Sequence, residues 1–124
     1  MQRKKILCVD DSATILMMER MILSKGPYDL VTASDGEEAV SKALAERPDL
    51  ILMDIVMPRM NGFDACRRIR QEEAIRATPV IMVTTEGERA KVVEAIQAGV
   101  SDYLIKPFTT AALQQKLQRF AIAV

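Results

Sequence analysis

Three aspartates stand at the ends of two short apolar segments of this 124-residue chain. Asp10 and Asp11 follow segment 5–9, and Asp54 closes segment 50–54. Nearly continuous apolar segments of this length are typical of strands in a parallel sheet that is buried on both faces. Ligands of such sheets bind beyond the carboxyl ends of the strands. Converging carboxylates repel one another and favour a hard cation, so we expect these three aspartates to form a Mg²⁺ site.

Two further polar side chains are expected at the same edge of the sheet. Thr84 ends the fourth predicted strand, and Lys106 follows the fifth. A cation, a hydroxyl and an ammonium could together surround a group with several negative oxygens, such as a phosphoryl group. Asp54 would then be the nucleophile that carries the phosphoryl group, because carboxylates form aspartyl phosphates. A strand-end Thr is common without a function and a lone Lys is usually solvated, so the inference depends on the whole set.

The composition excludes several other kinds of chemistry. Histidine is absent, which removes Ser-His-Asp triads and His-containing zinc sites. Lys plus Arg and Asp plus Glu both number 17, and this balance argues against direct nucleic-acid binding. No apolar segment is long enough to span a bilayer and no signal-peptide pattern is present, so we expect a cytoplasmic protein without membrane insertion. Cys8 and Cys66 are expected to be free and buried.

The elements that must position these residues alternate five times between strand and helix. The predicted strands are Lys5–Val9, Asp29–Ala33, Leu50–Asp54, Val80–Thr84 and Asp102–Ile105. The predicted helices are Ala13–Lys25, Gly36–Glu46, Gly62–Gln71, Glu88–Ala98 and Thr110–Phe120. This alternation indicates one α/β domain over residues 1–124. We expect a doubly wound, flavodoxin-like parallel sheet of five strands in order 2-1-3-4-5, with five helices on its two faces.

In this order and spacing, the polar residues make the chain resemble the receiver domains of two-component response regulators. The matching motifs are Asp10-Asp11-Ser12, Asp54-Ile-Val-Met-Pro-Arg-Met-Asn-Gly62, Thr84-Thr85 and Lys106-Pro-Phe108. Over essentially its full length the chain is similar to single-domain chemotaxis-type regulators. The resemblance implies a signalling switch, rather than a dedicated enzyme, that is phosphorylated on Asp54 with Mg²⁺ as cofactor.

The resemblance also assigns roles to individual residues. It implies Mg²⁺ binding by Asp11, Asp54 and the backbone carbonyl of Val56, with Asp10 helping through water. It further implies that Thr84 and Lys106 contact the phosphoryl oxygens and that Thr84 and Tyr103 form the switch. The output target would bind the fourth helix, fifth strand and fifth helix, through Arg89, Val92, Ile96, Tyr103 and Lys116. Val92 and Ile96 could equally be ordinary core residues.

Helix 13–25 carries more apolar residues than its contact with the core needs. Its expected core stripe, at spacings of three and four, is Ile15, Met18 and Ile22. The apolar residues left over are Leu16, Met17 and Met21. Met-rich exposed patches suit adaptable protein contacts. Because the chain has no histidine to donate a phosphoryl group, we expect this surface to dock a sensor histidine kinase or a histidine phosphotransferase, unless these residues are simply buried.

Other classes that share parts of this pattern fit less well. Phosphatases of the haloacid-dehalogenase type have a second Asp two residues after the nucleophile, where this chain has Val56. Flavodoxins need a phosphate-binding loop after the first strand, where Asp10 and Asp11 would repel a phosphate. Two contexts stay open, a stand-alone switch or a receiver module of a longer transcription regulator or hybrid kinase. We expect the first, because no linker follows Phe120.

Overall fold

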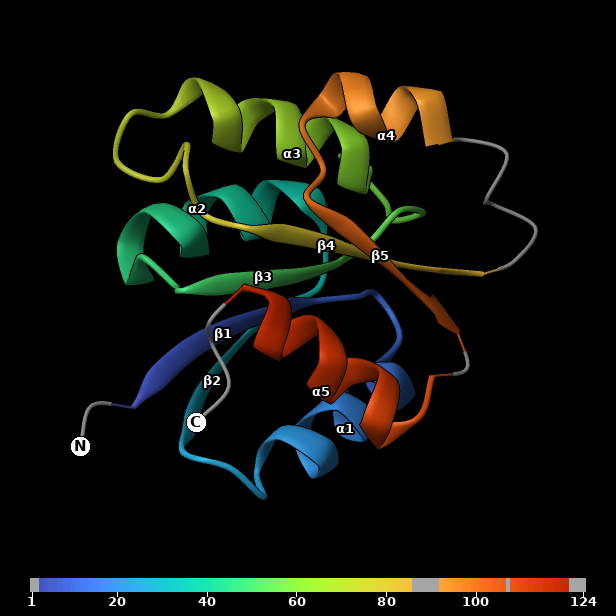
Figure 1. Cartoon of the computed structure of the whole chain (residues 1–124). Helices are drawn as coiled ribbons and strands as arrows, with labels where there is room; N and C mark the ends of the chain where they lie inside the picture. Colours follow the sequence, from blue (N-terminus) through green and yellow to red (C-terminus); the bar gives the residue numbers. More distant parts are fainter. Residues whose placement is uncertain (1–2, 86–91, 107, 121–124) are drawn as a thin grey trace.

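A five-stranded parallel sheet forms the centre of the computed structural model, which describes residues 3–85, 92–106 and 108–120. Its strand order, β2-β1-β3-β4-β5, confirms the sequence prediction. The strands are β1 (Lys4–Val9), β2 (Tyr28–Ala33), β3 (Leu50–Asp54), β4 (Val80–Thr85) and β5 (Asp102–Lys106). The helices are α1 (Ala13–Leu23), α2 (Gly36–Glu46), α3 (Gly62–Gln71), α4 (Val92–Ala98) and α5 (Thr110–Arg119). Figure 1 shows α2, α3 and α4 on one face of the sheet and α1 and α5 on the other, which is the expected flavodoxin-like arrangement.

The observed helix and strand boundaries differ from the predicted ones mainly at the end of α1 and at the end of β4. Helix α1 stops at Leu23 because tight turns take over, in which the Lys25 and Gly26 amides donate to Ile22 and Leu23. Strand β4 runs one residue further than predicted, since Thr85 pairs with Lys106 of β5. Residues 88–91 of the predicted fourth helix lie outside the described residues.

Alternating side chains of the buried strands fill two separate cores. Leu7 and Val9 of β1 belong to the core beneath α2, α3 and α4, whereas Ile6 and Cys8 belong to the core beneath α1 and α5. Every residue of β3 is buried, which explains why its sequence is continuously apolar up to Asp54. Both cysteines are free and buried, as predicted.

Short polar side chains fix the helix starts that surround the carboxyl edge of the sheet. The Ser12 hydroxyl accepts a hydrogen bond from the Ile15 amide at the start of α1, and Asp35 accepts one from the Glu38 amide at the start of α2. Such N-caps satisfy amides that have no partner inside the helix. Capping therefore sets where each helix leaves the edge that carries the aspartates. None of the helices in the described ranges is long and apolar enough to cross a membrane.

The core-facing side of α1 differs from the predicted stripe. Its buried residues are Glu19 and Leu23, and Leu16 and Ile22 pack against the same core. Of the predicted stripe only Ile22 takes this place, while Ile15 and Met18 are half-buried. The prediction was wrong because the stripe was chosen from apolar residues alone, which left out the buried Glu19. Leu16, expected on the surface with Met17 and Met21, therefore faces inward.

Glu19 is a buried carboxyl on a helix that otherwise presents apolar side chains to the core. It is 1% exposed, and among the described residues its Oε2 atom has no hydrogen-bond partner. Burial, and then the negative charge of Asp10, raise the pKa of Glu19 to about 8. The Glu19 side chain is therefore mostly protonated and uncharged at neutral pH.

Replacing Glu19 by Gln is expected to flatten the pH dependence of stability. The folded state holds the Glu19 proton up to about pH 8, whereas the unfolded chain releases it near pH 4.5, so wild-type stability falls as the pH rises through this window. Glu19→Gln cannot ionise, so relative to wild type it should gain stability between pH 4.5 and pH 8, by about 1.4 kcal/mol for each pH unit in which only the unfolded chain releases the proton. Urea unfolding in EDTA at pH 4.5 and pH 8 measures the difference.

Glu73→Gln is the control, because Glu73 is exposed on the protein surface. This variant should follow the wild-type curve at both pH values. If the Glu19→Gln and wild-type curves stay parallel between pH 4.5 and pH 8, Glu19 is ionised in the folded protein and the inference about its burial is wrong.

Candidate functional site

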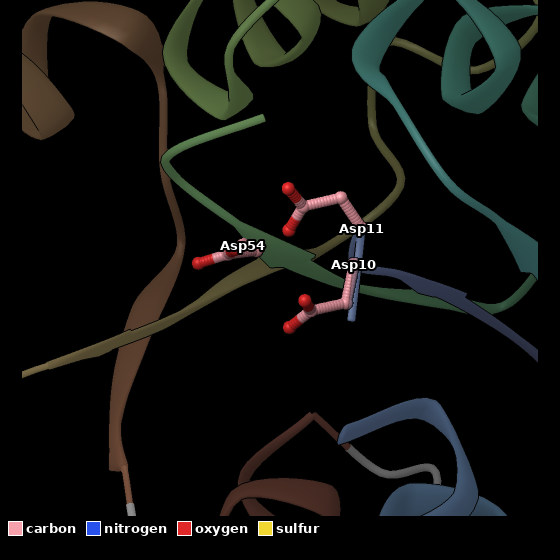
Figure 2. A group of neighbouring side chains, drawn as sticks. All are labelled: Asp10, Asp11 and Asp54. Carbon is pink, nitrogen blue, oxygen red and sulfur yellow. The ribbon is translucent and has the colours of Figure 1, made fainter. Parts of the chain in front are cut away.

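The three aspartates singled out in the sequence meet at the carboxyl edge of the sheet. One carboxylate oxygen from each of Asp10, Asp11 and Asp54 lies within 4.8 Å of those of the others. Figure 2 shows Asp10 and Asp11 extending from the end of β1, with Asp54 beside them at the end of β3. Asp10 and Asp54 are buried, whereas Asp11 is exposed. The carboxylates thus form a pocket with a closed inner side and an open outer side.

The register of the sheet explains why residues 44 positions apart meet. Strands β1 and β3 are direct neighbours, and Val9 pairs with Met53. The next residue of each strand is an aspartate, so Asp10 and Asp54 leave the sheet side by side. The amide of Asp10 still donates to Ala33 of β2, at 3.1 Å, which holds the end of β1 in place.

Lys106 supplies the positive charge of the pocket. Its Nζ atom lies 3.0 Å from Asp10 Oδ2 and 3.2 Å from Asp54 Oδ1. Burial alone would lower the pKa of the Lys106 ammonium, but the hydrogen bond to Asp10 and the charge of Asp54 outweigh burial, so its pKa lies above the ordinary value. Lys106 is therefore firmly protonated between the two buried carboxylates.

The Asp54 carboxylate is the most perturbed acid of the pocket. Burial, followed by the charge of Asp10, raises the pKa of Asp54 to about 6, and Lys106 offsets only part of this increase. Its Oδ1 atom accepts hydrogen bonds from the Ile55 amide at 2.9 Å and from Lys106. Asp54 is thus ionised at neutral pH, but only narrowly, and an added cation would favour the charged form.

Thr84 and Val56 lie beside the pocket on neighbouring elements. Thr84 is fully buried near the end of β4, one residue after Val83, which pairs with Asp54. Its hydroxyl donates to the Thr85 carbonyl at 3.3 Å. Val56 follows β3 in the loop to α3, and its side chain is 58% exposed. The proposed contacts of Thr84 with phosphoryl oxygens and of the Val56 carbonyl with Mg²⁺ stay predictions.

The residues expected to form the output surface lie in different environments. Ile96 of α4 is 69% exposed, so the alternative that it is a core residue is wrong. Tyr103 packs against the core beneath α2, α3 and α4, and its buried hydroxyl has no hydrogen-bond partner among the described residues. Lys116 lies 3.1 Å from Asp102. Arg89 and the side chain of Val92 lie outside the described residues.

The residues of α1 expected to bind a partner are divided between surface and core. Met17 and Met21 are 62% and 63% exposed, as predicted. A shallow groove of about 240 Å³ beside Met17 is lined by Ala13, Leu16, Met17, Arg20 and Thr32. A second groove, of about 250 Å³, is lined by Met18, Met21, Ile22, Lys25 and Thr110.

Sequence reasoning missed a buried carboxyl, Glu19, and an ion pair, Arg59–Asp35. Glu19 was overlooked, although its position three residues after Leu16 and four before Leu23 places it on the inner face of α1. The ion pair between Arg59 and Asp35 was also overlooked, since no local pattern connects a loop residue with a helix cap 24 positions earlier.

The chain matches the response regulator receiver domain over residues 6–118. It therefore belongs to the receiver-domain family of two-component response regulators. It is 40% identical over 116 residues to chemotaxis protein CheY1 of Helicobacter pylori, and the match covers 92% of this chain and 94% of CheY1. The chain spans about half the length of several transcriptional regulators that it also matches, such as 47% of PhoP of Bacillus subtilis at 37% identity.

Solved structures show the same relationship. Vibrio cholerae CheY4 superimposes with a TM-score of 0.90 at 38% identity, covering 96% of this chain and 99% of CheY4. The receiver domain of the sensor histidine kinase PA1611 of Pseudomonas aeruginosa has a TM-score of 0.88 at 36% identity, covering 96% of this chain and 98% of that domain. The PA1611 domain has a magnesium ion coordinated in its active-site cleft. The acidic pocket of this chain has the oxygen ligands that fit such an ion.

Mg²⁺ is expected to stabilise the folded protein by a small amount that rises with the logarithm of the Mg²⁺ concentration above its Kd. Because the pocket exists only in the folded state, a tenfold excess of Mg²⁺ over its Kd should raise the free energy of unfolding by about 1.4 kcal/mol. The affinity should fall below about pH 6, since Mg²⁺ then competes with the proton on Asp54. Urea unfolding during a Mg²⁺ titration, at pH 5 and at pH 7.5, measures both effects.

Asp11→Asn should lose most of this stabilisation, because it removes the exposed carboxylate of the pocket. Asp64→Asn is the matched control, since Asp64 is an exposed acid on α3 that faces Arg67. If Asp11→Asn and Asp64→Asn respond to Mg²⁺ alike, the cation binds at some other place and the assignment of the pocket is wrong.

Proposed function

We propose that this chain is a phosphorylation-activated signalling switch whose phosphoacceptor is Asp54. The observation that carries the proposal is the pocket formed by Asp10, Asp11 and Asp54, in which the Lys106 ammonium lies between Asp10 and Asp54. Bound Mg²⁺, held by the three aspartates with the Val56 carbonyl, would neutralise the charge of the incoming phosphoryl group. The switch acts in the cytoplasm and has no role as a dedicated phosphatase.

The arrangement of Asp54 suits phosphoryl transfer from a phosphohistidine. Among the described residues, the hydrogen bonds to its carboxylate go to Oδ1, which leaves Oδ2 open for bond formation. A new bond forms between this oxygen and phosphorus while the bond between phosphorus and the histidine nitrogen breaks. The imidazole keeps the electron pair of the broken bond and then takes up a proton. Lys106 stays in place, and its ammonium offsets the negative charge of the phosphoryl oxygens. The Thr84 hydroxyl contacts these oxygens as well.

The phosphohistidine that donates the phosphoryl group lies outside this chain, which has no histidine. A sensor histidine kinase or a histidine phosphotransferase supplies the phosphoryl group, and an output protein reads the result. The output target binds the surface formed by α4, β5 and α5, with Ile96 and Lys116 among its contacts. Direct contact with nucleic acid or insertion into a membrane forms no part of this proposal.

Thr84 and Tyr103 form the switch between pocket and output surface. Shifting a two-state equilibrium from 1:99 to 99:1 takes about 5.5 kcal/mol. One hydrogen bond to a charged group contributes roughly 1.5–3 kcal/mol, so Thr84 needs the help of Lys106 and Mg²⁺. Tyr103 packs against the core, and among the described residues its hydroxyl has no hydrogen-bond partner. No such hydrogen bond therefore has to break when the ring changes its position.

Phosphorylation by acetyl phosphate tests the proposal without knowledge of the kinase. Wild type should take up one phosphoryl group in Mg²⁺, and Asp54→Asn should take up none, because the amide cannot act as the nucleophile. Thr84→Ala should still be labelled but should capture less of the output protein when both are treated with beryllofluoride. Intact-mass spectrometry measures labelling, and a pull-down from lysate compares capture.

Asp64→Asn is again the control and should behave like wild type in both assays. Labelling of Asp54→Asn at the wild-type level would place the phosphoryl group on another residue and end the proposal. Full capture of the output protein by Thr84→Ala would remove Thr84 from the switch while leaving the phosphoacceptor in place.

The exposed methionines of α1 are proposed to dock the phosphoryl donor. Met17 and Met21 border the two grooves of α1, and α1 starts directly after Asp10 and Asp11. An adaptable apolar surface next to the pocket suits the helix bundle of a histidine kinase or phosphotransferase. A donor seated on α1 would therefore have its phosphohistidine close to the open side of the pocket.

Met17→Glu combined with Met21→Glu is expected to slow phosphoryl transfer from the donor about tenfold or more, because two carboxylates interrupt an apolar contact. Labelling by acetyl phosphate should stay unchanged, since the small donor does not touch α1. Leu44→Glu is the control, because Leu44 is an exposed apolar residue of α2, on the other face of the sheet. Assays of phosphoryl transfer from the phosphorylated kinase, stopped at successive times, measure the rates. Equal rates for wild type, the double variant and Leu44→Glu would end the docking proposal.

A further inference from the structure

The loop between β3 and α3, residues 55–61, is held at several points. At its end, the Gly62 amide donates to the Ile55 carbonyl at 2.8 Å, and a Cβ atom on Gly62 would lie 2.1 Å from the Asp54 carbonyl oxygen. Only glycine therefore allows α3 to start this close to the phosphoacceptor. In the middle of the loop, the Met57 side chain is buried in the core. Val56 lies between Ile55, whose carbonyl accepts the hydrogen bond from Gly62, and the buried Met57.

A third anchor connects the loop to the start of α2. The Arg59 guanidinium donates from Nε to Asp35 Oδ2 at 3.1 Å and makes a second contact from Nη2 to the same oxygen. The Asp35 side chain is 6% exposed and also caps α2 through Glu38, whereas the Arg59 side chain is 61% exposed. The hydrogen bond from the Glu38 amide, and then the one from Arg59, hold the pKa of Asp35 below its usual range. The pair is therefore fully charged at neutral pH.

The backbone of the loop follows the same contact. The Gly36 amide donates to the Met60 carbonyl at 3.0 Å, and a Cβ atom on Gly36 would lie 2.2 Å from that oxygen. Arg59 itself has a φ of 65°, in the left-handed region that costs a non-glycine residue energy. Such a conformation persists only where contacts hold it. Two contacts do so here: the Met60 amide donates to the Pro58 carbonyl at 2.7 Å across Arg59, and the Arg59 side chain pairs with Asp35.

We propose that the Arg59–Asp35 ion pair is a positioning element of the magnesium pocket, because it holds the loop that carries Val56 in the conformation that binds the cation. This inference rests on the proposed function. Mg²⁺ requires near-ideal octahedral geometry at short distances, so a ligand on a loose loop binds it less well. Losing the Arg59 side chain removes one of the two contacts that hold the strained residue three positions from Val56, and it takes two N–H donors away from a buried carboxylate. Neither residue touches the cation or the phosphoryl group.

The Mg²⁺ dependence of acetyl phosphate labelling separates positioning from general damage to the fold. Arg59→Gln should raise the Mg²⁺ concentration for half-maximal rate roughly three- to tenfold, less than the 10–100-fold typical of direct partners of metal ligands. The maximal rate at saturating Mg²⁺ should stay within about twofold of wild type, since the cation then restores the loop. Asp35→Asn should cause a similar shift, because Asn still caps α2 but carries no charge.

Combining both substitutions tests whether the two residues act as a pair. The double variant should resemble either single variant, because the second change removes a partner that has already lost its contact. Arg59→Lys, which keeps the charge but not the planar fork, should give an intermediate shift. Arg67→Gln is the matched control, since it breaks an exposed Arg–Asp contact on the adjacent helix α3 and should leave the Mg²⁺ dependence unchanged.

Several results would overturn the inference. A half-maximal Mg²⁺ concentration for Arg59→Gln equal to wild type, with the protein folded by urea titration, would show that the pair does not position the loop. A lowered maximal rate without a shift in Mg²⁺ dependence would point to general damage instead. Labelling of wild type that does not depend on Mg²⁺ would contradict the proposed function itself. An unchanged Mg²⁺ dependence of Arg59→Gln would contradict the Arg59–Asp35 inference alone, so the two failures can be told apart.

Discussion

Repulsion among carboxylates held within 4.8 Å of one another is the constraint on which the rest of the structure depends. Two unit charges 4 Å apart repel by about 4 kcal/mol at an effective dielectric constant of 20. Three ionised aspartates and the Lys106 ammonium leave a net charge of −2 at the edge of the sheet. A divalent cation brings this charge to zero. The net charge of the pocket is therefore zero only when a divalent cation is bound.

The same constraint explains why acids beyond the pocket behave unusually. Asp10 and Asp54 are buried at the ends of strands that are covered by helices on both faces of the sheet. The Asp10 charge raises the pKa of both Asp54 and Glu19. Glu19, which has less help from Lys106 than Asp54 has, takes up a proton instead of adding a further charge. Neutralising this one side chain keeps α1 packed beside a strongly negative site.

Much of the site could be predicted because it follows from strand ends. Continuous apolar segments marked β1 and β3 as buried neighbours, and the residues directly after them had to meet at one edge. The position of Lys106 followed in the same way from β5. The core side of α1 was mispredicted because its stripe was chosen from apolar residues alone, which leaves out a carboxyl that is kept neutral even though its spacing from Leu16 and Leu23 places it on the inner face. The contact between Arg59 and Asp35 depends on how a loop folds across α2, which no local pattern encodes.

The exposed helices that flank the pocket lie on both faces of the sheet. Asp11 and Val56 are exposed and mark the open side of the pocket. Helix α1 begins at this opening and lies on one face of the sheet, whereas α4 with its exposed Ile96 lies on the other face (Figure 1). Helix α5 lies on the same face as α1, and Thr110 at its start lines the groove beside Met21, so a partner that covers α5 would approach the one on α1. Helix α4 packs against α3, which begins at Gly62 next to Asp54, so α3 is a direct structural connection between the pocket and α4.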